Sequence, residues 1–182
     1  REHMENLEKQ SRFQLQALQS HLSPHFLFNC LNTISGLARS QDTEAITSTI
    51  AHLGGLLRYA LEATSQTQVY LEEEIRFTQN YIALQQNRFE GCFQFDLQAQ
   101  LSDTYKLCPP FCIQTLVENI FSHNELSRTK PISIRVKITE QNRLIQIAVE
   151  NSPRIPSEFE STGTGLQNLR ERLYLLYKKE AE

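Results

Sequence analysis

The segment from Pro24 to Asn29 (PHFLFN) places a proline, a histidine and an asparagine at spacings that suit phosphoryl chemistry. The neutral imidazole of His25 offers a free ring nitrogen, which is a competent nucleophile toward phosphorus near neutral pH. Proline inside a helix removes a backbone hydrogen bond, so Pro24 is expected to kink or restart the helix and to expose His25. Asn29 follows one turn later on the same face and can hydrogen-bond a ring nitrogen. These residues are therefore compatible with a histidine that acts as a nucleophile toward phosphorus.

Two other interpretations of His25 stay open on these residues. The side chain can be a structural histidine packed between Phe26 and Phe28. His21 and His25, at positions i and i+4, can also form part of a metal site, although no third histidine, cysteine or carboxylate lies nearby to complete it.

A second group of candidate residues lies near the end of the sequence. Gly163 and Gly165 let the backbone approach a phosphate closely, and a helix expected to start at Leu166 would offer free N–H groups to an anion. A glycine pair of this kind is common in loops. It indicates phosphate binding only in combination with other motifs.

The elements that position these residues follow from the spacing of the apolar side chains. Residues 7–40 indicate one long helix interrupted at Ser23-Pro24, and Asp42 is a suitable N-cap for a second helix. That helix carries an apolar stripe made of Ile46, Ile50, Leu53, Leu57 and Leu61. Two antiparallel helices with narrow seams can bury them by pairing with a second copy into a four-helix bundle, or by packing on the rest of the same chain.

The remainder of the sequence mixes helices and strands after a polar linker expected at residues 62–68. Expected helices cover residues 71–89, 111–123 and 166–177, and expected strands cover residues 93–99, 132–138 and 144–149, with a hairpin turn at 140–143 and a loop at 151–165. We therefore expect an α+β fold in two domains, with helices in residues 1–67 and an α+β layer in residues 68–182.

Composition excludes several classes of protein. The 182 residues are 40% apolar, which suffices for a core. A net charge of −3 and a pI near 6.0 provide no basic field for nucleic acid or an anionic membrane surface. The four cysteines form no CxxC pair and are expected to be reduced and mostly buried. No apolar run approaches the length of a membrane span, and we expect these residues to be cytoplasmic. We also expect them to be a piece of a longer protein whose anchor or sensor lies upstream.

The PHFLFN segment lies within residues 18–32 (LQSHLSPHFLFNCLN), which resemble the phosphoacceptor signature of LytS-type sensor histidine kinases. Three further motifs follow in the order of that family. They are a connector helix (LEEEI at 71–75, with Tyr81-Ile82 and Arg88-Phe89), an N box (LVEN at 116–119, with His123) and a glycine box (GTGLQNLRERL at 163–173). Four motifs in the same order make the resemblance specific.

The resemblance implies an ATP-dependent protein-histidine kinase. Its fold would be a dimeric four-helix bundle carrying the acceptor histidine, followed by an α/β-sandwich ATP-binding domain of the GHKL type that is truncated at its C-terminal strands. His25 would accept the phosphoryl group, assisted by Asn29 and Glu118, and Asn119 would hold Mg²⁺ through its amide oxygen, a hard ligand for a hard cation. The residues implied at the ATP site are Asn119, His123, Glu150, Asn151, Gly163, Gly165, Leu166 and Asn168.

The family resemblance also implies partners. They are a second copy of the chain and a response-regulator receiver domain, often joined to a LytTR-type DNA-binding domain, which takes the phosphoryl group onto an aspartate. No direct contact with nucleic acid is expected, and the membrane would be reached only through upstream segments.

Some residues depart from the family pattern. An Asp-Asn-Gly-x-Gly segment that usually contacts adenine is replaced by residues 150–154 (ENSPR), without glycine, and Ser122 and Asn124 replace a common basic residue and a common glycine. These departures favour an alternative function, a catalytically degenerate dimeric docking module with weak or no nucleotide binding. The intact PHFLFN segment and Asn119 oppose that alternative, and a plain coiled-coil scaffold would not account for the glycine box.

Overall fold

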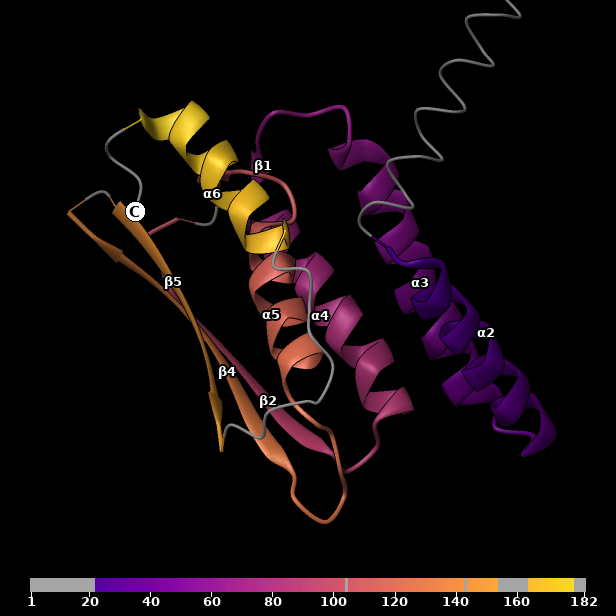
Figure 1. Ribbon diagram of the computed structural model, residues 1–182. Helices are drawn as coiled ribbons and strands as arrows, with labels where there is room; N and C mark the ends of the chain where they lie inside the picture. Colours follow the sequence, from indigo (N-terminus) through magenta and orange to yellow (C-terminus); the bar gives the residue numbers. More distant parts are fainter. Residues whose placement is uncertain (1–21, 104, 143, 154–163, 179–182) are drawn as a thin grey trace, which may run out of the picture.

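The computed structural model describes residues 22–103, 105–142, 144–153 and 164–178. The described chain is α+β, with a helical hairpin at one end and a sheet at the other (Figure 1). Its elements in chain order are α2 (Pro24–Arg39), α3 (Thr43–Ala63), β1 (Val69–Tyr70), α4 (Leu71–Arg88), β2 (Phe93–Gln100), β3 (Leu107–Cys108), α5 (Cys112–His123), β4 (Ile132–Gln141), β5 (Leu144–Ser152) and α6 (Thr164–Tyr177).

Local capping sets the start of both hairpin helices. The Ser23 hydroxyl accepts a hydrogen bond from the Phe26 amide at 3.1 Å, and Pro24 occupies the first turn of α2, where its missing N–H costs nothing. Asp42 caps α3 by accepting from the Ala45 amide at 3.0 Å. Helix α2 thus begins at Pro24, where the sequence predicted a kink or a restart, and the predicted N-cap at Asp42 is confirmed. The expected helix before residue 22 lies outside the described residues.

The larger sheet has the strand order β2-β4-β5. Strand β2 pairs in parallel with β4, starting at Phe93 opposite Ile132, and β4 pairs antiparallel with β5. A parallel pair needs a long crossover connection, and here that connection contains α5. Strands β1 and β3 form a separate two-stranded ladder that the sequence pattern did not predict.

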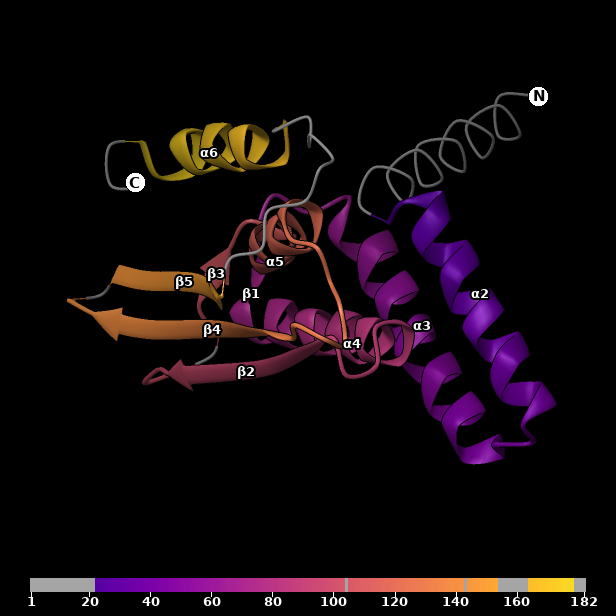
Figure 2. The same ribbon diagram turned by 60° about the horizontal axis from the view of Figure 1, so that its bottom comes forward.

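Helices α4 and α5 cover one face of the larger sheet, and none of the described helices lies on its other face (Figures 1 and 2). The alternating pattern of β4 explains this arrangement, because every second side chain is buried toward the helices while the others are exposed. The buried side chains of β4 are Ile132, Ile134, Val136 and Ile138.

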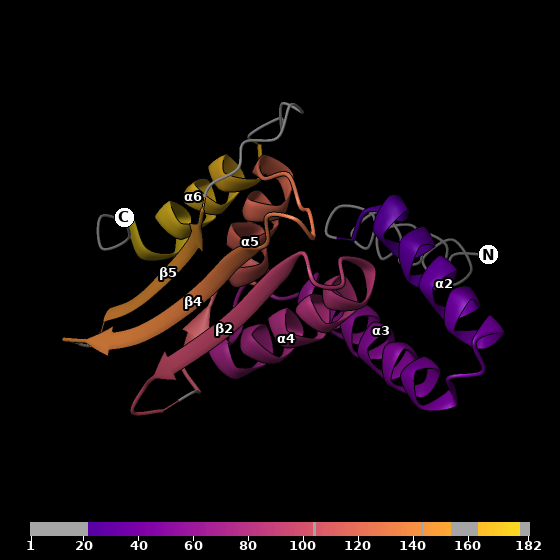
Figure 3. The same ribbon diagram turned by 90° about the horizontal axis from the view of Figure 1, so that it is seen from below.

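Helix α3 packs on α4 through a face that differs from the predicted stripe (Figure 3). The buried residues of α3 are Thr49, Leu56, Tyr59, Ala60 and Ala63. Leu53 and Leu57 of the stripe lie at the edge of this core, but Ile50 and Leu61 remain 52% and 42% exposed. The stripe therefore overlaps only partly with the surface that the chain buries on itself.

Several boundaries differ from the sequence expectation. Helix α3 continues to Ala63, into the expected linker, and α6 begins at Thr164 rather than Leu166. Strand β5 extends through Ser152, so Asn151 lies in a strand and not in the expected loop, because the ladder with β4 continues to its first residues. The rest of that loop, residues 154–163, lies outside the described part of the chain.

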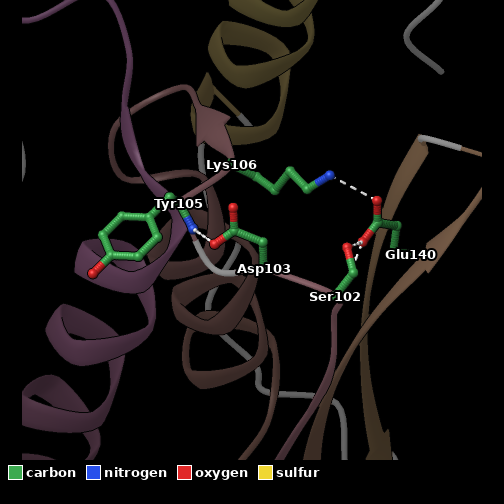
Figure 4. Close-up of polar contacts among 5 residues, drawn as sticks. All are labelled: Ser102, Asp103, Tyr105, Lys106 and Glu140. Carbon is green, nitrogen blue, oxygen red and sulfur yellow. Dashed lines mark hydrogen bonds and ion pairs between the residues drawn. The ribbon is translucent and has the colours of Figure 1, made fainter.

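The segment between β2 and β3 is attached to β4 by one carboxylate (Figure 4). Glu140 accepts from Lys106 Nζ at 2.7 Å and from the Ser102 amide at 3.1 Å. Together with the Ser102 hydroxyl, these donors lower the pKa of Glu140 to about 2. This contact fixes the path of the chain from the sheet into β3 and toward α5.

Two expectations drawn from composition agree with the structure. All four cysteines are buried and free, as predicted. Among the described helices, none has both the length and the apolar character that a membrane crossing requires.

Candidate functional site

His25 lies in the first turn of α2, and its side chain is exposed to solvent. The two phenylalanines that follow His25 differ in burial, because Phe26 is only 7% exposed while Phe28 is 66% exposed. His25 is therefore not packed between two buried rings, which removes the main argument for a purely structural histidine. His21, the other half of the alternative metal pair, lies outside the described residues.

Asn29 contacts His25 across one helical turn, as its spacing predicted. Its amide nitrogen lies 3.3 Å from Nδ1 and 3.4 Å from Nε2 of the ring. An amide N–H can only donate, so the contact suits an unprotonated ring nitrogen, which is the nucleophilic form of imidazole. Because the two distances are nearly equal, the contact does not single out one nitrogen as the acceptor.

Helix α5 carries the N-box residues, and its Glu118 has an altered acidity. Burial raises the pKa of Glu118 from 4.5 to about 7, while a hydrogen bond of 2.8 Å from Gln114 Nε2 opposes this rise. A carboxyl group with a pKa near neutral pH is suited to accept and release a proton.

Asn119 and His123 follow on α5 at a spacing of four residues and share one face of the helix. Both side chains are half-buried. Within the described part of the chain, the Asn119 side chain makes no hydrogen bond, so its amide oxygen is available to a ligand. This availability fits the role of a hard oxygen ligand for Mg²⁺.

The described residues contain no cluster of three or more histidine, cysteine or acidic side chains that could enclose a metal ion. Magnesium in phosphoryl-transfer sites usually has one or two protein ligands and takes the others from water and substrate phosphates. A single amide oxygen from Asn119 is compatible with that kind of site and not with a metal cage built from protein alone.

Asn151 and Glu150 are adjacent in sequence but lie on opposite faces of β5. Asn151 is paired with the buried Ile134 and donates from Nδ2 to Asn124 Oδ1 at 3.0 Å, beside the C-terminal end of α5. Glu150 is paired with the exposed Arg135 and is itself exposed. Since directly paired residues share a face, the Glu150 side chain points away from α5. The structure brings Asn151 to the N-box helix and does not bring Glu150 there.

The glycine-box helix α6 lies beside α5 (Figures 1 and 3). A Cβ built on Gly165 would lie 3.5 Å from Thr115 Cγ2, which is ordinary contact, and Arg172 donates to the Pro110 carbonyl at 2.8 Å. Leu166 and Asn168 are exposed at the start of α6. Gly163 lies outside the described residues. The described glycine-box residues therefore lie next to the helix that carries Asn119.

Helix α2, which carries His25, and helix α5, which carries the N box, are separated by α4. The Tyr81 ring of α4 stacks on Phe26 of α2 with a centroid distance of 5.2 Å and meets Phe121 of α5 edge-on at 6.0 Å. The hydrogen bonds described for His25 and for Glu118 stay within their own helices. The sequence motifs thus form two sites joined by one buried tyrosine, and not a single assembled centre.

Sequence reasoning missed the role of two residues. Glu74 is fully buried on α4 and binds the start of α5, and Asn124 is 6% exposed and links α5 to Asn151. A signal for Glu74 was present, because it shares the buried helical face of Leu71, Thr78 and Tyr81, where an apolar residue would be expected. Asn124 offered no comparable signal.

Comparison with known proteins agrees with these motifs. A family model described as histidine kinase matches residues 13–93. The sensor protein LytS of Streptococcus mutans is 35% identical over 90% of this chain and 30% of its own length. The sensor histidine kinase YesM of Bacillus subtilis is 33% identical over 95% of this chain and 31% of its own, and the sensor histidine kinase/phosphatase LytS of Staphylococcus aureus is 32% identical over 92% and 31%.

The chain therefore spans about 30% of the length of the curated relatives that it matches. The family model covers the PHFLFN segment and α4 and ends before the N box. This chain belongs to the family of LytS-type sensor histidine kinases.

Proposed function

We propose that this chain is the phosphoacceptor and ATP-binding part of a two-component histidine kinase. The γ-phosphoryl group of ATP is transferred to His25 and then to an aspartate of the receiver domain of a response regulator that carries a LytTR-type domain. The observation that carries the proposal is the exposed imidazole of His25 at the start of α2, with Asn29 beside it. Membership of the sensor histidine kinase family supports it.

In the proposed reaction, an unprotonated ring nitrogen of His25 forms a bond to the γ-phosphorus while the bond from that phosphorus to the bridging oxygen of ATP breaks and ADP leaves. Asn29 orients the ring by donating to this nitrogen before the attack, and that hydrogen bond breaks as the lone pair of the nitrogen bonds to phosphorus. Glu118, with a pKa of about 7, accepts the proton that the phosphorylated ring releases. Because α4 lies between α2 and α5, the reaction requires either a rearrangement within this chain or α5 of a second copy.

The proposed division of the chain assigns residues 1–67 to dimerisation and phosphoacceptance and residues 68–182 to a GHKL-type ATP-binding domain. Within the second part, the described residues that support nucleotide binding are Asn119, His123, Asn151, Gly165, Leu166 and Asn168. Bound Mg²⁺ would neutralise charge on the phosphate oxygens. The orientation of Glu150 toward the opposite face of the sheet argues against its contact with the same nucleotide.

Replacing Asn119 with alanine is expected to weaken Mg²⁺-dependent ATP binding by at least about tenfold, because loss of a group that supports a metal site costs at least that much affinity. Isothermal titration with Mg²⁺ and a non-hydrolysable ATP analogue measures this change. Asn87→Ala serves as the control, because the Asn87 amide bonds Thr49 on α3, away from the site. Equal affinities for Asn119→Ala and the unaltered protein would contradict the metal assignment.

A homodimer is part of the proposal, and exposed apolar side chains on the hairpin support it. The large apolar residues left open on α2 and α3 are Phe28, Leu31, Ile50 and Leu61. Ile50→Glu is expected to weaken self-association by at least about tenfold, since it places a charge in an apolar interface. Sedimentation equilibrium measures this, with Ser48→Glu on the polar side of α3 as the control. A protein that is monomeric without any substitution would contradict the dimer.

The central experiment incubates the full-length protein with Mg²⁺ and γ-labelled ATP. A phosphorylated histidine is expected, recognised by label that is lost in acid and retained in base. Adding a receiver domain should then move the label onto that domain. Label that is stable in acid, or no label at all, would contradict the kinase and leave the docking module as the better interpretation.

A further inference from the structure

A buried carboxylate joins the phosphoacceptor hairpin to the N-box helix. Glu74 of α4 is 0% exposed, and its oxygens accept hydrogen bonds from two other elements. The Tyr59 hydroxyl of α3 donates to Oε1, which also accepts from the Phe111 amide, and the Ile113 amide donates to Oε2 at 3.0 Å. Three donors from α3 and from the start of α5 therefore meet at one side chain.

Helix α5 depends on Glu74 because its own N-cap residue supplies no side-chain oxygen. That residue is Phe111, whose φ of 62° lies in the left-handed region. The first amides of a helix have no partner inside the helix and need an external acceptor. Glu74 provides this acceptor from 37 positions earlier in the chain, and burial raises the pKa of its carboxyl group.

Aromatic packing reinforces the same junction. The Tyr59 ring lies 4.6 Å from the Phe77 ring and 5.4 Å from the Phe111 ring, measured between centroids, and Phe77 and Phe111 meet at 5.5 Å. These three rings come from α3, α4 and the start of α5. Interiors packed this closely transmit displacements instead of absorbing them.

We propose that Glu74 is a positioning residue for the N-box helix and that its hydrogen bond from Tyr59 ties the position of α5 to that of the phosphoacceptor hairpin. Asn119 lies six residues after Ile113 on α5, about 9 Å along the helix axis. A rotation of α3 would move Tyr59, then the carboxylate, and then the helix that carries Asn119. This inference rests on the proposed function for the nature of the ligand at α5.

The test compares three variants of the full-length protein. Tyr59→Phe removes the hydroxyl and keeps the ring, so Glu74 still caps α5. Glu74→Gln places an amide N–H against a backbone N–H donor, so one of the first amides of α5 loses its acceptor. Thr49→Val is the matched control, because Thr49 is also fully buried on α3 and accepts a hydrogen bond from Asn87 of α4 at 3.2 Å, but has no contact with Glu74.

Tyr59→Phe is expected to lower the rate of His25 phosphorylation at saturating ATP by at least about fivefold while ATP affinity stays within about twofold. The rate of hydrogen exchange at the amides of residues 111–113 should rise about fivefold, which corresponds to the net free energy of one hydrogen bond. Glu74→Gln should raise that exchange by more than about tenfold and also weaken ATP binding. Thr49→Val should change none of these quantities.

Equal effects of Tyr59→Phe and Thr49→Val would overturn the inference, because they would show general loosening of the α3–α4 contact. Unchanged exchange at residues 111–113 in Tyr59→Phe would overturn it as well, and this holds even if Glu74→Gln fails to fold. If the unaltered protein gives no phosphohistidine, the proposed function fails, while the exchange measurements without nucleotide still decide whether Tyr59 and Glu74 hold α5.

Discussion

His25→Gln reduces the acid-labile label to background in the proposed kinase assay, whereas His52→Gln leaves it unchanged. Glutamine is planar and polar like imidazole but has no nucleophilic ring nitrogen, so only the chemistry is removed. Substitution at an exposed position with no buried contacts changes stability by about 0.5 kcal/mol or less. The loss of label can therefore be assigned to the missing nucleophile.

His52 is a suitable control because it belongs to the same helical hairpin and has a different partner. Its Nδ1 lies 3.0 Å from Asn80 Oδ1 at the contact of α3 with α4. The measurement is the amount of base-stable phosphate after a fixed incubation with Mg²⁺ and γ-labelled ATP. Label that survives in His25→Gln would remove His25 from the mechanism.

Glu118→Gln is expected to stabilise the protein at pH 8 by about 3 kcal/mol and to lower the phosphorylation rate by about 100-fold or more. The stability change follows from the pKa of Glu118, which burial raises from 4.5 to about 7 in the folded protein. The folded state therefore holds its proton over a range in which the unfolded chain has lost it. The stability that protonated Glu118 contributes is fully present below pH 4.5 and is lost as the pH rises through 7.

Glutamine does not titrate and can still accept the hydrogen bond from Gln114. The loss of stability at high pH should therefore be absent in Glu118→Gln. Urea unfolding from pH 4 to pH 8 measures the difference. For Glu140, the dependence of stability on pH should run in the opposite direction, and Glu140→Gln tests this. Because the pKa of Glu140 is lowered to about 2, its contribution is present above pH 4.5 and is lost as the pH falls toward 2. Parallel pH profiles for the unaltered protein and Glu118→Gln would refute the raised pKa.

Much of the fold could be predicted because its signals are local. The alternation in β4 and the capping oxygens of Ser23 and Asp42 act over a few residues, and the corresponding elements lie close to where they were expected. The parallel pairing of Phe93 with Ile132 could not be predicted in this way, because nothing near either residue specifies a partner so distant in sequence. Tertiary contacts alone determine it.

In the candidate site as well, features set by nearby residues could be predicted and features set by tertiary contacts could not. Exposure of His25 and its contact with Asn29 follow from a proline and a spacing of four residues. The opposite orientations of Glu150 and Asn151 depend on the register between β4 and β5, which shifts every side chain to the other face when it changes by one residue. A motif comparison treats adjacent residues as one unit, so it could not separate these two side chains.

The junction at Glu74 has a consequence for work on excised fragments. A fragment starting at residue 68 would retain Glu74 and the amides of α5 but would lack the Tyr59 hydroxyl, and it would expose ring surface of Phe77 and Phe111 that Tyr59 covers. Burial of a carboxylate that has lost a donor is costly. Such a truncated piece is expected to be less stable than the intact chain, so the cut is better placed before α3.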